Sequence, residues 1–254
     1  MTANDWSFET KQIHAGYDID PATGATALPI YQTSSYAFED TAQAASRFAL
    51  QELGPIYTRL TNPTTDGVAA RIAALEGGVG GLLVSSGQSA TALSILALAV
   101  AGNNVVASPS LYGGSVTLLK NTLGRLGIEA RFVPDPLDPE AWRALADDKT
   151  VAFYGETIPN PQGDILDIEP IAKVAHEVGV PLIVDNTVAT PYLVRPIEWG
   201  ADIVVHSATK YLGGHGTSIA GAIVDSGNFD FASQPERFPL YNTPDESYHG
   251  LVYA

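Results

Sequence analysis

The sequence predicts an α/β protein in which a mostly parallel sheet of about seven strands carries helices on both faces, after an extended N-terminal arm. Short apolar runs alternate along the chain with segments of helical spacing, which is typical of βαβ units. Runs such as Leu182–Asp185 are almost continuously apolar, as strands covered on both faces must be. Of 254 residues, 45% are hydrophobic and 16% are charged, which suffices for a large core and excludes bulk disorder or a coiled coil.

The expected elements follow the chain in three regions. Residues 1–61 are rich in Pro, Gly, Thr and Tyr and form the arm, with one short helix near Thr41–Gln51. Residues 62–232 form the α/β domain, and the pattern stops in residues 233–254. We expect strands at Gly81–Ser85, Val105–Ser108, Glu129–Val133, Val151–Tyr154, Leu182–Asp185, Ile203–His206 and Ala220–Asp225. We expect helices at Val68–Glu76, Ser89–Ala101, Val116–Leu126, Pro139–Asp147 (N-cap Asp138) and Ile168–Val178 (stop at Gly179).

The charge and the composition exclude several classes of partner. The chain has 13 Lys and Arg against 28 Asp and Glu, so its formal net charge is 13 − 28 = −15, and no basic patch is visible for nucleic acid. The chain has no Cys, which excludes disulfides and a cysteine nucleophile. Residues 1–11 lack the apolar core of a signal peptide, and the longest apolar stretch, Leu93–Ala101, is too short to span a membrane. We expect a cytoplasmic protein without membrane contact.

Several common motifs do not match. The glycines of Gly77–Gly81 precede a strand and lack the G-x-G-x-x-G spacing of a dinucleotide site. A phosphate-binding P-loop and the G-x-S-x-G nucleophile elbow are absent from the sequence. The five histidines show no H-E-x-x-H spacing, so we interpret them as ordinary core or surface residues and expect no metal.

Side chains that could bind a ligand or react follow the carboxyl ends of three predicted strands, where ligands bind in open α/β sheets. In Val84–Ser89 a strand runs through a small-residue turn into a helix, whose free N–H groups favour a phosphate. In Leu182–Thr187 an apolar strand ends in a carboxylate. In Val204–Tyr211 a strand leads to Lys210, which we expect to be desolvated and therefore nucleophilic. A phosphate cradle, a carboxylate and a lysine are what pyridoxal 5′-phosphate (PLP) needs.

Six ordered motifs make the sequence resemble the Cys/Met-metabolism family of PLP-dependent enzymes, which has the aspartate-aminotransferase-type fold (fold type I). The motifs are Tyr57-Thr58-Arg59, Ser86-Gly87-Gln88, Tyr112-Gly113-Gly114, Glu156-Thr157-Ile158-Pro159-Asn160-Pro161, Asp185-Asn186-Thr187 and Ser207-Ala208-Thr209-Lys210. The resemblance runs from about Thr10 to the end of the sequence.

The resemblance implies a role for each matched residue. Lys210, Tyr112 and Asp185 form the catalytic set: Lys210 binds PLP covalently and shuttles protons, Asp185 keeps the ring nitrogen protonated, and Tyr112 stacks on the ring. The remaining cofactor-binding residues are Ser86, Gly87, Gln88, Ser207 and Thr209 around the phosphate, Asn160 and Thr187 near the ring, and Tyr57 and Arg59. The last two would reach the phosphate of a neighbouring subunit, in a homotetramer built from dimers that share active sites.

Less specific sequence features resemble the O-acetylhomoserine sulfhydrylase branch of the family. They are Phe8–Gly16, Gln88, where other branches usually carry Met, and Tyr248–Leu251. The implied reaction converts O-acetylhomoserine and sulfide, or methanethiol, into homocysteine, or methionine, with release of acetate.

Two alternatives stay open. The chain could act as a cystathionine γ-synthase or as a cystathionine or methionine γ-lyase on the same scaffold. Alternatively, it could be a catalytically incomplete fragment that only binds the cofactor, because family members continue into a C-terminal domain that we expect to begin after residues 233–254.

Overall fold

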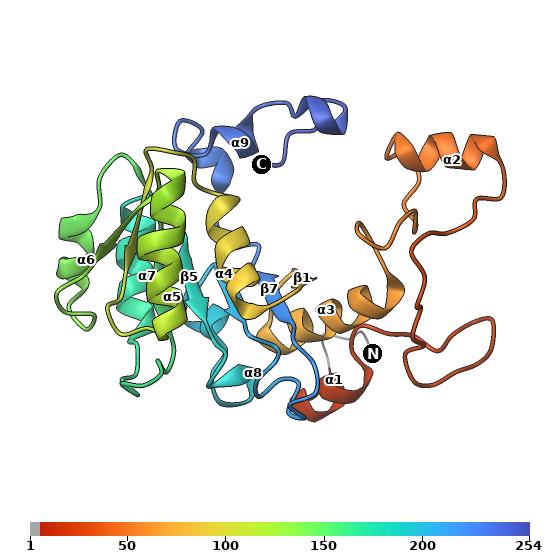
Figure 1. The fold of residues 1–254 in the computed structure, drawn as a ribbon, viewed down its shortest axis with the longest axis horizontal. Coiled ribbons are helices and arrows are strands. Elements are labelled where there is room, and N and C mark those ends of the chain that lie inside the picture. Colours follow the sequence, from red (N-terminus) through yellow and green to blue (C-terminus); the bar gives the residue numbers. More distant parts are fainter. Residues whose placement is uncertain (1–5) are drawn as a thin grey trace.

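A computed structural model describes residues 6–254, so the first five residues of the predicted arm lie outside the described part of the chain. Its centre is a seven-stranded sheet with the strand order β1-β7-β6-β5-β4-β2-β3 (Figure 1). The strands are β1 (Gly80–Val84), β2 (Asn104–Ala107), β3 (Glu129–Phe132), β4 (Thr150–Glu156), β5 (Leu182–Asp185), β6 (Ile203–His206) and β7 (Gly221–Asp225). The predicted sheet is confirmed, and each strand lies within two residues of its expected position.

Five neighbouring strands, from β3 to β6, run parallel, while β7 pairs antiparallel with both β6 and β1. The helices are α1 (Phe8–His14), α2 (Thr41–Phe48), α3 (Pro63–Glu76), α4 (Gly87–Leu96), α5 (Gly113–Thr117), α6 (Pro139–Leu145), α7 (Ile168–Glu177), α8 (Thr190–Leu193) and α9 (Pro239–Asn242). The carboxyl ends of the parallel strands therefore meet along one edge of the sheet.

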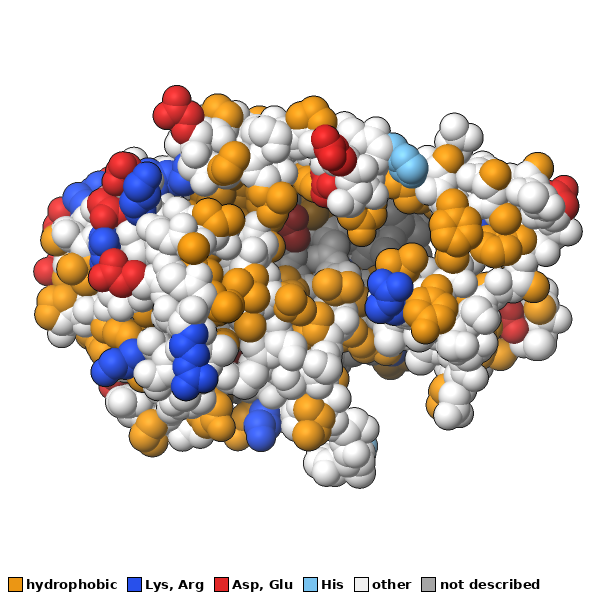
Figure 2. All heavy atoms as spheres, turned by 45° about the horizontal axis from the view of Figure 1, so that its top comes forward, with side chains coloured by type: hydrophobic (Ala, Val, Ile, Leu, Met, Phe, Trp, Pro, Cys, Tyr) orange, Lys and Arg blue, Asp and Glu red, His pale blue; other side chains and the backbone are white. Residues whose placement is uncertain are grey.

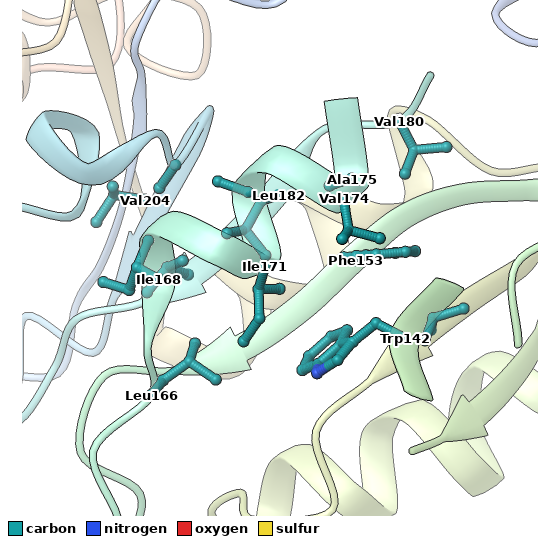
Figure 3. Close-up of a cluster of buried hydrophobic side chains, with 14 of the residues drawn as sticks. Trp142, Phe153, Leu166, Ile168, Ile171, Val174, Ala175, Val180, Leu182 and Val204 are labelled. Atoms are coloured by element: carbon teal, nitrogen blue, oxygen red, sulfur yellow. The ribbon is translucent and has the colours of Figure 1, made fainter. Parts of the chain in front are cut away.

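Two apolar clusters cover the two faces of the sheet. Phe153 on β4 and Leu182 on β5 point into the first cluster, where Trp142 of α6 and Ile171 of α7 also lie (Figure 3). The next residues along the strands, Tyr154 among them, point into the second cluster with α4 and the helical segment that begins at α5. Burial of alternate residues on opposite faces explains why the strands are continuously apolar.

The predicted helix at Val116–Leu126 is broken into three parts. After α5, residues Leu118–Leu123 form a π-helical segment and Gly124–Leu126 form a turn of 3₁₀ helix. Glycines at positions 113, 114 and 124 weaken the ordinary α-helix at both ends, while the apolar side chains of the π-helical segment keep their buried positions.

The N-terminal arm contains two helices instead of the one expected. The additional helix, α1, begins after Ser7, whose side chain accepts a hydrogen bond from the N–H of Thr10. None of its residues is buried, so it lacks the apolar periodicity by which a helix is recognised in a sequence. The arm extends away from the sheet in Figure 1.

Residues after β7 pack back onto the α/β domain. Phe238 is buried against Phe229 and Phe231, and the ring of Tyr241 stacks on Phe231 with 4.3 Å between centroids. Across residues 6–254, the helices are all too short or too polar to cross a membrane.

Candidate active site

Ten of the twelve predicted site residues line one cleft of about 970 Å³ at the carboxyl ends of the parallel strands. They are Ser86, Gly87, Gln88, Tyr112, Asn160, Asp185, Thr187, Ser207, Thr209 and Lys210. The surface is hollowed between the α/β domain and the arm, and mainly hydrophobic side chains border the hollow, with acidic and basic ones among them (Figure 2). Three separate strand ends thus contribute to a single site, as their sequence patterns predict.

The turn into α4 lies against the turn that follows β6. A Cβ atom on Gly87 would lie 2.6 Å from Cβ and 2.8 Å from Cα of Ser207, so this approach requires glycine. Ser86 caps α4 by accepting a hydrogen bond of 3.1 Å from the N–H of Ser89. The first N–H groups of a helix have no partner within it, so those of Gly87 and Gln88 remain available to an anion.

Asp185 lies half-buried at the end of β5. Its Oδ1 accepts hydrogen bonds from the N–H of Thr187 at 2.9 Å and from the Thr187 hydroxyl at 2.5 Å. Within residues 6–254, the hydrogen bonds to this carboxylate all end on Oδ1, so Oδ2 remains available for a ligand. Burial raises the pKa of Asp185, while the hydrogen bonds from Thr187 oppose that shift.

The two threonines use their hydroxyl groups within the protein. Besides contacting Asp185, the Thr187 hydroxyl accepts a hydrogen bond of 2.7 Å from the N–H of Ser207. The Thr209 hydroxyl donates to the carbonyl of Ala220 and accepts from the N–H of Ala220. Thr187 therefore orients the aspartate, and Thr209 connects the lysine-bearing turn to the segment before β7.

Glu156 also lines the cleft, although its place in the motif Glu156–Pro161 predicted no role for it. It lies opposite Asp185 in the β4–β5 register and is almost completely buried. It accepts hydrogen bonds from the N–H of Tyr112 at 2.9 Å and the hydroxyl of Ser115 at 3.1 Å. Burial, followed by the charge of Asp185, raises its pKa to about 7. Its position at a strand end, like that of Asp185, was the signal that could have identified it.

The exposure of Lys210 differs from what the sequence predicts. The sequence predicts a desolvated lysine, but the side chain is exposed in the cleft. The reason is that Lys210 follows β6 in a turn, beyond the strand residues that the core covers. Its neighbours Ser207 and Thr209 are only half-buried.

Tyr57 and Arg59 do not lie in the cleft with the other ten residues. They line a separate hollow in the arm, together with Ile30, Tyr31 and Asn62. The two side chains form a cation–π pair, with the Arg59 Cζ atom 5.4 Å from the centre of the Tyr57 ring. Both are exposed.

Comparisons with known proteins agree with this geometry. The model of the Cys/Met metabolism PLP-dependent enzyme family matches residues 9–243. The chain is 52% identical to the O-acetyl-L-homoserine sulfhydrylase of Corynebacterium glutamicum, covering 99% of this chain and 58% of the relative. It is 55% identical to the enzyme of the same name from Leptospira meyeri, covering 96% of this chain and 55% of the relative.

A solved structure from Campylobacter jejuni, assigned as an O-acetylhomoserine (thiol)-lyase and carrying N′-pyridoxyl-lysine-5′-monophosphate, superposes with a TM-score of 0.94. Its sequence is 42% identical, and the match covers 98% of this chain and 60% of that one. The chain thus spans about three fifths of the length of the proteins that it matches.

Proposed function

This chain belongs to the Cys/Met metabolism family of PLP-dependent enzymes, and from that premise we propose that it catalyses γ-replacement on O-acetylhomoserine. Sulfide, or methanethiol, forms the new C–S bond at the γ carbon, the C–O bond to acetate breaks, and homocysteine, or methionine, is the product. The observation that carries the proposal is the meeting of Gly87, Asp185 and Lys210 in one cleft. The names of the relatives at 52% and 55% identity support the choice of substrate.

The residues of the cleft fit PLP at its phosphate end. The N–H groups of Gly87 and Gln88 and the hydroxyl of Ser207 would hold the phosphate, at a helix N-terminus that favours an anion. The close approach of Gly87 to Ser207 supports this assignment, because a side chain at position 87 would fill the cradle.

The opposite end of the cofactor would meet Asp185. Its Oδ2 is free to accept a hydrogen bond from a protonated ring nitrogen, while Thr187 holds Oδ1. When bound, PLP supplies an electron sink for negative charge on the substrate carbon next to the amino group. The carboxylate of Asp185 strengthens that sink by keeping the nitrogen protonated.

The remaining catalytic work is proton transfer and orientation. The Nζ atom of Lys210 would hold the cofactor before the substrate arrives, then take the α-proton and later a β-proton of the substrate. The ring of Tyr112 would stack on the cofactor, and Asn160 would contact its hydroxyl side. Glu156 fixes the backbone of Tyr112 at the mouth of the cleft, so we assign it a positioning role.

We place Tyr57 and Arg59 at the phosphate in a second copy of the chain. Within one chain, these two residues lie outside the cleft that the other ten residues line. This supports the arrangement, because a second copy could bring its own Tyr57 and Arg59 to that cleft. The proposed assembly is a homotetramer of dimers that share active sites.

The test measures homocysteine and acetate formed from O-acetylhomoserine by the PLP-loaded protein, with and without sulfide. We expect formation of both products to depend on sulfide and to be lost in Lys210→Ala, together with the visible absorbance of lysine-bound PLP. Lys173→Ala, on the surface of α7, is the matched control and should leave both readouts unchanged.

Other outcomes contradict the proposal in distinct ways. Cleavage of cystathionine or methionine without turnover of O-acetylhomoserine would identify a lyase. A visible absorbance band without any turnover would identify a fragment that only binds the cofactor.

A further inference from the structure

A buried polar cluster lies directly behind the cleft, formed by Glu76, Asn186 and His206. All three are fully buried, with relative exposures of 0%. Glu76 is the last residue of α3, Asn186 follows β5 and His206 ends β6. The Oε1 atom of Glu76 accepts hydrogen bonds from Nδ2 of Asn186 at 2.9 Å and from Nε2 of His206 at 2.5 Å. One carboxylate thus joins the ends of two neighbouring strands.

The cluster is a poor way to stabilise this fold. Glu76 Oε2, Asn186 Oδ1 and His206 Nδ1 have no hydrogen-bond partner in the described part of the chain. Each unpaired buried polar atom destabilises the folded state, and apolar residues often replace buried ion pairs without loss of stability. The residues around it, such as Val184 and Val204, belong to the apolar core. The presence of the cluster is therefore better explained by the residues that it positions than by a contribution to stability.

Each strand end in the cluster carries a residue of the cleft. Asn186 directly follows Asp185, and His206 directly precedes Ser207. On the cleft side, the N–H of Ser207 donates to the Thr187 hydroxyl at 2.7 Å, which donates to Asp185 Oδ1 at 2.5 Å. Movement at either strand end would therefore change the distance between the ring-binding and phosphate-binding residues.

We propose that Glu76 is a positioning residue for the cofactor: through Asn186 and His206 it fixes the two strand ends that carry Asp185 and Ser207. The proposal rests on the proposed function only in assuming that the cleft binds PLP. Glu76 itself is separated from the cleft and touches no reacting atom.

The test compares Glu76→Ala with Asp202→Ala. Asp202 is a matched control because it also holds a histidine, His176 at 2.8 Å, and the N–H of Leu182 at 2.8 Å, but at the opposite ends of β5 and β6. We expect Glu76→Ala to raise the dissociation constant for PLP about tenfold or more, which is about 1.4 kcal/mol. Asp202→Ala should lower the thermal stability of the PLP-free protein without changing PLP affinity. Equal PLP affinity in the two variants would overturn the proposal.

A second variant separates the hydrogen bonds from the bulk of the side chain. Glu76→Gln keeps an oxygen that can accept from Asn186 and His206, so we expect its PLP affinity to stay close to that of the unaltered protein. A large loss of PLP affinity in Glu76→Gln would contradict the proposal. A protein that binds PLP but forms no homocysteine would contradict the sulfhydrylase assignment and leave this one standing.

Discussion

The cleft and the N-terminal arm are built in opposite ways. Asp185 and Ser207 stand at the ends of strands whose other residues are packed on both faces, so the chain's own core holds them in place. In the arm, from residue 6 to residue 61, only Ala15 is buried, while Ile30 and Leu53 are 83% and 89% exposed. Turns, helix caps and backbone pairing such as Ser35 with Tyr57 hold the arm. The difference indicates that the chain's own core holds the cleft in place, whereas the arm has almost no core of its own, as we expect for a segment that a second copy covers in the proposed assembly.

Replacing Asp185, the proposed partner of the ring nitrogen, should cause the largest effect. Asp185→Asn keeps the size of the side chain but removes its charge, so kcat should fall about 10²–10³-fold, as for other residues that stabilise developing charge. Steady-state kinetics check this, with Asp164→Asn as the control, because Asp164 is a carboxylate that bonds Ser110 outside the cleft. Equal losses in the two variants would mean that the charge at Asp185 has no special role.

The second prediction concerns the pH dependence of stability in the PLP-free protein. The pKa of Glu156 is raised from 4.5 to about 7. Its stabilising contribution to the free energy of unfolding is therefore fully present below pH 4.5 and is lost as the pH rises through 7. At 1.36 kcal/mol per pKa unit this amounts to about 3 kcal/mol. Glu156→Gln should remove that dependence. Urea unfolding of both proteins at pH 4.5 and pH 8 checks it, and parallel changes in the two would contradict it.

A smaller effect is expected in the arm. Arg59→Ala should weaken PLP binding about tenfold, the value of one hydrogen bond to a charged group. Because we assign Arg59 to a second copy, the PLP affinity of the unaltered protein should fall on dilution, and that of the variant should not. Fluorescence titration at several protein concentrations measures this. A loss that is independent of concentration would place the action of Arg59 within its own chain.

The smallest effect should come from an exposed apolar residue of the arm. Leu53→Ser should change the free energy of unfolding of a single chain by less than about 0.5 kcal/mol, because the side chain is 89% exposed. Self-association, measured by analytical ultracentrifugation, should nevertheless weaken. A large loss of stability without a change in association would show that the arm, like the cleft, depends on its own chain.

Much of the α/β domain could be predicted because its signals are local. Leu182–Asp185 and Ile203–His206 are strands with the predicted bounds, since apolar runs of four residues suit a strand covered on both faces. The helix α1 could not be predicted, because none of its residues is buried and it has no apolar period. Over Val116–Leu126 the spacing predicted a helix, but not its change to π-helical and 3₁₀ geometry. The exposure of Lys210 could not be predicted either, because it depends on which segments cover the turn after β6.

The sequence by itself determined the parallel sheet, the residues at three strand ends and the chemistry that lysine, aspartate and a small-residue turn can perform together. It did so because periodicity and residue type act over a few neighbouring positions. Only the tertiary structure decided that Glu156 lies beside Asp185, that Tyr57 and Arg59 lie apart from the cleft, and that Glu76 meets His206, which is 130 positions away along the chain. Such contacts depend on how strands order in the sheet and how helices pack on it, which no local pattern specifies.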